Sequence, residues 1–176
     1  MKKLFFVLFS LTINVDTFAA FESTYEPLQS EKILFINGNI LDGEGNELLD
    51  TDLLIADGKI IAIGKGISVD DKDVKIIDAK NKWITPGIID IHSHMGVYPA
   101  PSVRTSSDGN EATSPVTAEV WAEHSMWVQD PQYALALKGG ITTFHVLPGS
   151  ANLIGGRGVT VKNLQRNTIQ SMKYPD

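Results

Sequence analysis

The sequence contains no cysteine among its 176 residues. This absence excludes disulfide bonds, zinc sites built from thiolates and a cysteine nucleophile. Histidine, aspartate, glutamate and lysine are therefore the only candidate metal ligands, and the chain has four histidines.

Basic residues are also scarce, because 15 lysines and arginines are outnumbered by 21 acidic residues, which gives a formal net charge of −6. Such a chain has no basic surface for phosphate backbones or anionic lipid, so neither nucleic-acid binding nor polybasic membrane docking is indicated. Hydrophobic residues make up 43% of the chain, which is ordinary for a globular protein with a sizeable core. We expect a small-molecule partner.

The sequence begins with a hydrophobic stretch that is short for a membrane span. A spanning helix needs about 20 apolar residues, whereas the run Leu4 to Val15 is interrupted by three polar side chains. A basic Met1-Lys2-Lys3 precedes it, and Thr17-Phe18-Ala19 follows with small residues at the −3 and −1 positions of a cleavage site. We therefore predict that residues 1–19 are a secretory signal, that the protein is exported to the periplasm, and that no stable membrane span remains. An uncleaved anchor is the alternative.

Residues 32–86 consist of short β patterns. The stretch 53–64 contains two strands joined by Asp57-Gly58, a strong hairpin signal. Further strands are expected at 32–38, 74–79 and 82–87, the last two paired around Asn81, while 41–47 and 68–73 have loop composition. These patterns predict a small antiparallel β unit.

The pattern changes after Pro86-Gly87. The run "IIDIH" is typical of a strand buried on both faces, and "ITTFHVL" at 141–147 is a second one. Between them, Ser114-Pro115 predicts the start of a helix with a stripe at Val116, Val120, Trp127 and Val128, and Asp130-Pro131 predicts a second helix that ends at Gly139. The sequence thus predicts a βαβ unit, with a further strand at 158–164.

Two histidines stand at the end of the first of these strands. Side chains alternate along a strand, so Asp90, His92 and His94 are expected on one face. Two imidazoles at this spacing can both reach one divalent ion. The alternative is a pair of core or surface histidines, which would cost about 1–3 kcal/mol for each buried polar group left unpaired. The spacing therefore favours a metal site at His92 and His94.

Three stretches carry a family resemblance. "ADGKIIAIG" followed by "IIDA" and "WITPGIIDIHSHMG" resembles the amidohydrolase superfamily, and "GGITTFHVLPGSANLIGGRG" is similar to its imidazolonepropionase-like branch. The resemblance covers about residues 32–165. It implies a β-sandwich portion over 32–86 and the N-terminal part of a (β/α)8 barrel over 87–176. It also implies one or two divalent ions, zinc first, held partly by His92 and His94, and hydrolysis of the C–N bond of an amide, cyclic amide or dipeptide.

Other residues are weaker candidates. The loop 97–113 follows the histidines, so Tyr98 is expected in an active-site wall, although a merely solvated loop is as plausible. Arg157 is a candidate substrate anchor if its loop is more than a tight turn, and His145 a second substrate contact if it is not a core histidine. Asp90 is expected beneath the ligand pair. Lys162 is a remote candidate for a carbamylated bridging ligand. We expect His124 to be structural, and Glu119 and Glu123 to lie on a solvated helix face.

The rest of such a site has no matching residues here. Residues 87–176 suffice for two or three of the eight strands of a barrel, and the general base expected on a late strand is absent. One hypothesis is therefore the truncated N-terminal part of a hydrolase, completed by a second chain or by nothing. The other is a non-catalytic module that binds a partner and has at most weak metal affinity. Exposed strand edges would in either case favour self-association, for example as a homo-oligomer.

Overall fold

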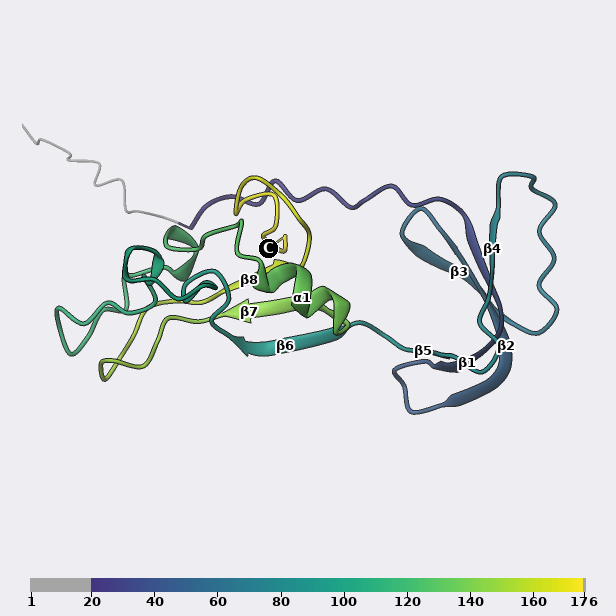
Figure 1. The fold of residues 1–176 in the computed structure, drawn as a ribbon, viewed down its shortest axis with the longest axis horizontal. Helices are drawn as coiled ribbons and strands as arrows, with labels where there is room; N and C mark the ends of the chain where they lie inside the picture. Colours follow the sequence, from purple (N-terminus) through teal and green to yellow (C-terminus); the bar gives the residue numbers. More distant parts are fainter. Residues whose placement is uncertain (1–19, 176) are drawn as a thin grey trace, which may run out of the picture.

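The computed structural model describes residues 20–175, so the predicted signal segment lies outside the described residues. Figure 1 shows an elongated molecule with one sheet at each end. Two extended stretches connect the ends: the chain before β1, which runs alongside the second sheet, and the chain between β5 and β6. Within the described range, no helix is long and apolar enough to cross a membrane.

The first sheet has five strands in the order β3-β2-β1-β4, with β5 also paired to β1. Their bounds are β1 Ile33–Leu41, β2 Glu47–Ala56, β3 Lys59–Gly64, β4 Lys75–Asp78 and β5 Trp83–Ile84. The turn between β2 and β3 has positive φ at both Asp57 (51°) and Gly58 (69°). Two positive values in a two-residue loop match the twist of antiparallel strands, so the predicted hairpin is confirmed.

The predicted pairing of β4 with β5 is wrong. Both strands run parallel to β1, with Ile33 opposite Lys75 and Asn39 opposite Trp83. The turn around Asn81 (φ 61°) steps the chain sideways without reversing it, because β1 continues past the turn and Asn39 N–H bonds to Lys82 O at 2.9 Å. The unit is thus one mixed sheet rather than an antiparallel one. The predicted sandwich is not confirmed.

The second sheet has the order β6-β7-β8, with bounds β6 Ile88–Ser93, β7 Ile141–Val146 and β8 Val159–Lys162. β6 and β7 are parallel, and the helix α1 (Gln132–Lys138) lies in the connection between them, so the βαβ unit is confirmed. β8 is antiparallel to β7. It is therefore no third parallel barrel strand: the chain folds back from β7 to β8 with no helix between them.

The first of the two predicted helices is wrong and the second is confirmed. Residues 114–128 contain only a 3-10 turn, η2 (Ala122–His124), because their main-chain N–H groups bond to another segment: Thr117 donates to Ile154 O and Ala122 to Arg157 O, both at 2.9 Å. A second 3-10 turn, η1, spans Arg104–Ser106. In α1, by contrast, Gln132 N–H bonds to the Asp130 carboxylate at 2.9 Å, and the helix ends at Gly139 as expected.

The core lies on one face of the second sheet, under α1. Phe144 and Val146 are fully buried there, and Tyr133 of α1 stacks on Phe144 with 5.4 Å between ring centroids. β6, in contrast, leaves Ile89 63% and Ile91 77% exposed. The prediction of a strand buried on both faces is thus wrong for β6 in the described residues, because β6 is an edge strand with β7 as its only neighbour.

A buried ion pair holds the chain before β1 against the second sheet. Glu123 and Lys173 are 2% and 6% exposed, and their charged atoms lie 3.1 Å apart. Both members of the pair bind the main chain of Phe21: its N–H donates to the Glu123 carboxylate at 2.8 Å, and its carbonyl accepts from Lys173 at 2.6 Å. The expectation of a solvated Glu123 is wrong, since its segment is not the helix that the expectation assumed.

Breaking this ion pair should destabilise the fold. We expect Glu123→Gln to lower the free energy of unfolding by about 3–5 kcal/mol, because Lys173 would keep a buried charge without a counterion. Urea denaturation measures the change. The matched control, Glu119→Gln, alters an exposed carboxylate and should stay within about 0.5 kcal/mol of the parent chain. Equal effects of the two substitutions would contradict a structural role for the pair.

The edge of β6 should drive self-association. Exposed isoleucines beside unpaired main-chain groups offer a template for another strand. We expect Ile89→Lys with Ile91→Lys to shift the chain towards monomer in sedimentation velocity experiments. Leu153→Lys, which changes an 83% exposed leucine in a loop after β7, should leave the distribution unchanged. A parent chain that is already monomeric would contradict the prediction.

Candidate metal centre

The two histidines meet at the carboxyl end of β6. His92 is the second-last residue of the strand, and His94 is the first residue after it. Their ring centroids lie 5.3 Å apart, and the ring planes are at 86° to each other. The register between β6 and β7 shifts between Asp90 and Ser93, so the strict alternation assumed from the sequence is interrupted. The imidazoles converge nevertheless.

Main-chain groups fix the orientation of this pair. His94 Nδ1 lies 2.8 Å from Leu147 O, just past the end of β7. Because a carbonyl oxygen can only accept, Nδ1 donates this hydrogen bond, and the neutral ring then has its lone pair on Nε2. Asp90 accepts a hydrogen bond from His92 N–H at 3.1 Å, so it acts on the main chain of His92 rather than on its ring. The neutral form of His94 is thus held in the tautomer whose free nitrogen is Nε2.

A cavity of about 350 Å³ opens beside the histidines, and most of its wall is the segment 147–156 between β7 and β8. This wall is attached to the long segment that follows the histidines. Gly149 N–H bonds to Gly109 O at 2.5 Å, and Ala151 N–H bonds to the Asn110 side chain at 3.1 Å. The two segments therefore form one wall around the imidazoles.

Of the candidate substrate contacts, the structure brings only Tyr98 to the histidines. Its ring lies 5.7 Å from that of His94, edge to face. Arg157 points elsewhere: its guanidinium lies 4.7 Å above the Trp121 ring and donates to Ala118 O at 3.1 Å. Arg157 thus connects its own loop to the segment 118–121, and it does not line the cavity beside the histidines.

His145 and Lys162 are also separate from the pair. His145 bonds through Nδ1 to Thr160 at 3.0 Å and lines a different cavity, together with Glu123 and Lys173. Lys162 is opposite Thr143 in the register, and Thr143 in turn is opposite Ile89. Since β8 is antiparallel, this register puts Lys162 towards the opposite end of the sheet from His92.

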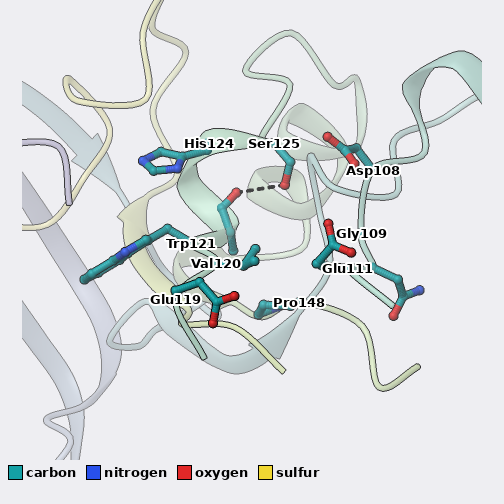
Figure 2. Close-up of a pocket in the computed structure, with 11 residues that line it drawn as sticks. Asp108, Gly109, Glu111, Glu119, Val120, Trp121, His124, Ser125 and Pro148 are labelled. Carbon is teal, nitrogen blue, oxygen red and sulfur yellow. Dashed lines mark hydrogen bonds between the residues drawn. The ribbon is translucent and has the colours of Figure 1, made fainter. Parts of the chain in front are cut away.

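Figure 2 shows another cavity, which shares Pro148 with the first one and is rich in acidic groups. Asp108, Glu111 and Glu119 line it, with His124 at its edge. Hydrogen bonds from Thr113 hold the pKa of Glu111 below its ordinary value, so this carboxylate stays charged. The ring of His124 also packs edge-on against Phe21, with 4.8 Å between centroids, and the structural role expected for it stays a prediction.

Within residues 20–175 no three histidine, aspartate or glutamate side chains converge as a complete ligand set. Within the described residues, the candidate centre therefore consists of two converging imidazoles. The sequence reasoning missed the Leu147 carbonyl, which orients one of them. The signal was present, because strands at 88–92 and 141–147 that pair in parallel must end at the same edge.

The fold and the site together define a class: an α/β protein whose polar groups gather where parallel strands end. Comparison with known proteins narrows this class, although no family model matches the chain. An amidohydrolase of Hapsidospora irregularis, tasK, is 35% identical over 114 residues, and a dihydroorotase of Bacillus cytotoxicus is 34% identical over 117 residues. A solved amidohydrolase structure from Thermotoga maritima is 36% identical, with a TM-score of 0.72.

These similarities cover part of each protein. They span 64% and 66% of this chain but 12% and 21% of the two curated relatives, and 82% of this chain but 37% of the solved structure. Over the part that they cover, these comparisons point to the amidohydrolase superfamily. None of these three relatives is named an imidazolonepropionase, so that branch stays a prediction.

The turn into β8 yields a test of this packing. A Cβ at Gly158 would lie 2.5 Å from His145 Nε2 and 2.8 Å from Val146 O, whereas at Gly155 its nearest neighbour would be 3.5 Å away. We expect Gly158→Ala to lower the free energy of unfolding by about 1–3 kcal/mol, because backbone must move to admit the methyl group. Gly155→Ala, measured in the same urea titration, should change it little. The reverse order would contradict the placement of His145.

Proposed function

We propose that this chain is the N-terminal part of a metal-dependent hydrolase that cleaves a C–N bond in an amide, cyclic amide or dipeptide. One observation carries the proposal. His94 bonds through Nδ1 to Leu147 O at 2.8 Å, which leaves Nε2 free beside the ring of His92. Metal-binding histidines characteristically donate their second ring N–H to a carbonyl or carboxylate in this way.

The donor set fits a divalent ion. Two neutral imidazoles suit zinc and several other transition metals, and zinc is the first candidate, as one ion or as one of two. When bound, such an ion supplies Lewis-acid activation of water and of a carbonyl oxygen. The chain's own contribution is orientation: Leu147 O sets the His94 ring, and Asp90 holds the main chain at His92.

The cavity beside the histidines admits a small molecule, bounded by the wall 147–156 and, at His94, by Tyr98. In this proposal, Tyr98 contacts substrate beside the ligand pair. Arg157, which is engaged by Trp121 and Ala118, instead maintains the shape of the wall.

The remaining parts of the centre are supplied from outside the described residues. β6 and β7 would be two of the eight parallel strands of a (β/α)8 barrel, which needs at least about 200 residues. Further ligands and the general base would come from later strands, either on a longer form of this chain or on a second chain. The limited share of the relatives that the chain spans supports this proposal. The proposal also includes export to the periplasm, with residues 1–19 as the secretory signal.

A second function is favoured by the incomplete ligand set. Two histidines converge, and in residues 20–175 no third histidine, aspartate or glutamate completes a ligand set with them. The chain can therefore instead be a non-catalytic module that binds a partner through the open edge of β6. Such a module would have at most weak metal affinity.

Metal titration separates the two functions. We expect the purified chain to bind Co²⁺ or Zn²⁺ at His92 and His94, and His92→Ala and His94→Ala each to weaken binding at least tenfold, because one of two imidazole ligands is lost. His124→Gln is the matched control, since it changes a histidine outside the candidate site. Calorimetry and the Co²⁺ absorption spectrum measure the affinity.

Hydrolysis assays with amides, cyclic amides and dipeptides complete the test. Binding with turnover that both alanine variants abolish would establish a hydrolase in this chain alone. Binding without turnover would support a centre that needs the missing strands. Absence of binding in the parent chain would overturn the metal proposal in favour of the non-catalytic module.

A further inference from the structure

Asp130 is a buried acid next to the segment that follows the two histidines. It is 2% exposed, and its carboxylate accepts four hydrogen bonds. Oδ2 accepts from Gly96 N–H at 3.0 Å and from the Gln132 side chain at 2.9 Å. Oδ1 accepts from Ala100 N–H at 3.2 Å and from Gln132 N–H at 2.9 Å. Two of these four bonds come from Gln132, the first residue of α1, and the other two come from Gly96 and Ala100.

The bonds to Gly96 and Ala100 fix the chain just after His94. His94 O accepts hydrogen bonds from Val97 N–H at 3.2 Å and from Tyr98 N–H at 3.0 Å, so residues 94–98 form a tight turn. Asp130 holds this turn at Gly96, and Gln132 holds it through a 3.0 Å bond to Tyr98 O. The main chain that carries His94 is thus attached to the start of α1.

Packing around Gly96 reinforces this attachment. Gly96 has a φ of 82°, a conformation that disfavours side chains, and a Cβ there would overlap the hydroxyl of Tyr133. Its carbonyl accepts a hydrogen bond from Trp127 N–H at 2.9 Å. The turn therefore has little room to move as long as the Asp130 carboxylate holds it.

We propose that Asp130 is a positioning residue for the metal-ligand pair: it sets the main chain of His94, while Leu147 O sets the ring. The inference rests on the proposed function, because it assigns Asp130 to the same centre. The competing role is that of a local cap for α1 alone. The two roles differ in what happens at His94 when Asp130 is changed.

Asparagine at position 130 is the sharpest substitution. A carboxamide keeps the shape of the side chain but replaces one acceptor oxygen by an NH2 group, which would face the N–H of Gly96 or of Ala100. One attachment of the turn must then open. The matched control is Asn163→Ala. Asn163 is 3% exposed and its side chain donates to Tyr133 O and Ile141 O, so its loss weakens the same core without a direct bond to residues 94–100.

Co²⁺ titration of the 176-residue chain tests the inference. We expect Asp130→Asn to weaken Co²⁺ binding about 10–100-fold, the usual effect of removing a group that supports a ligand, and to change the Co²⁺ absorption spectrum. Asn163→Ala should lower the urea midpoint yet keep the spectrum and an affinity within about threefold of the parent. Wild-type affinity and spectrum in Asp130→Asn would overturn the inference and leave Asp130 as a helix cap.

A metal-free measurement separates failure of the inference from failure of the proposed function. In the ¹H–¹⁵N spectrum of the imidazoles, Asp130→Asn should shift the His94 Nδ1–H signal, and Asn163→Ala should not. If the parent chain binds no Co²⁺ but this shift occurs, the proposed function fails and the positioning role stands. If His94 is unchanged, the positioning role fails. Should Asp130→Asn not fold, Gln132→Leu removes the bond to Tyr98 O and should give a smaller change in the same direction.

Discussion

The parallel pairing of β6 with β7 is the constraint on which the candidate site depends. Parallel strands end at the same edge, so the chain that leaves β6 with two histidines lies beside the chain that leaves β7 with the Leu147 carbonyl. The connection between such strands must cross the sheet, and α1 does so over the Phe144 face. The core and the site are therefore two results of one pairing.

The long segments around this edge form a wall because they satisfy each other's main chain. Residues 109–122 and 147–158 exchange hydrogen bonds such as Thr117 N–H to Ile154 O and Arg157 N–H to Val120 O. In the described structure, neither segment contains an α-helix or a β-strand that would pair its main-chain groups within the segment itself. This mutual dependence explains why Arg157 is engaged within the wall, and why a helix does not form at 114–128.

Local signals in the sequence predicted local structure well. The Asp57-Gly58 hairpin, the start of α1 at Asp130-Pro131 and the convergence of His92 and His94 follow from neighbours within a few residues. The errors concern partners that lie far away in the chain. The parallel course of β4, the reversal at β8 and the burial of Glu123 depend on β1, β7 and Lys173, and no short pattern reveals such partners. The role of Leu147 was missed because it acts through a carbonyl that every residue possesses, although the predicted parallel pairing already placed the ends of the two strands at one edge.

The ion pair between Glu123 and Lys173 also has a kinetic meaning. It joins Phe21 to a residue 152 positions later, so the chain before β1 can be fastened only after the whole second sheet is in place. Contacts of such long sequence separation require a large loss of chain entropy before they form, and they slow folding. On a ribosome, the segment at Phe21 would emerge early and would stay unattached until Lys173 had been synthesised. The exposed isoleucines of β6 would be open to other chains throughout that interval.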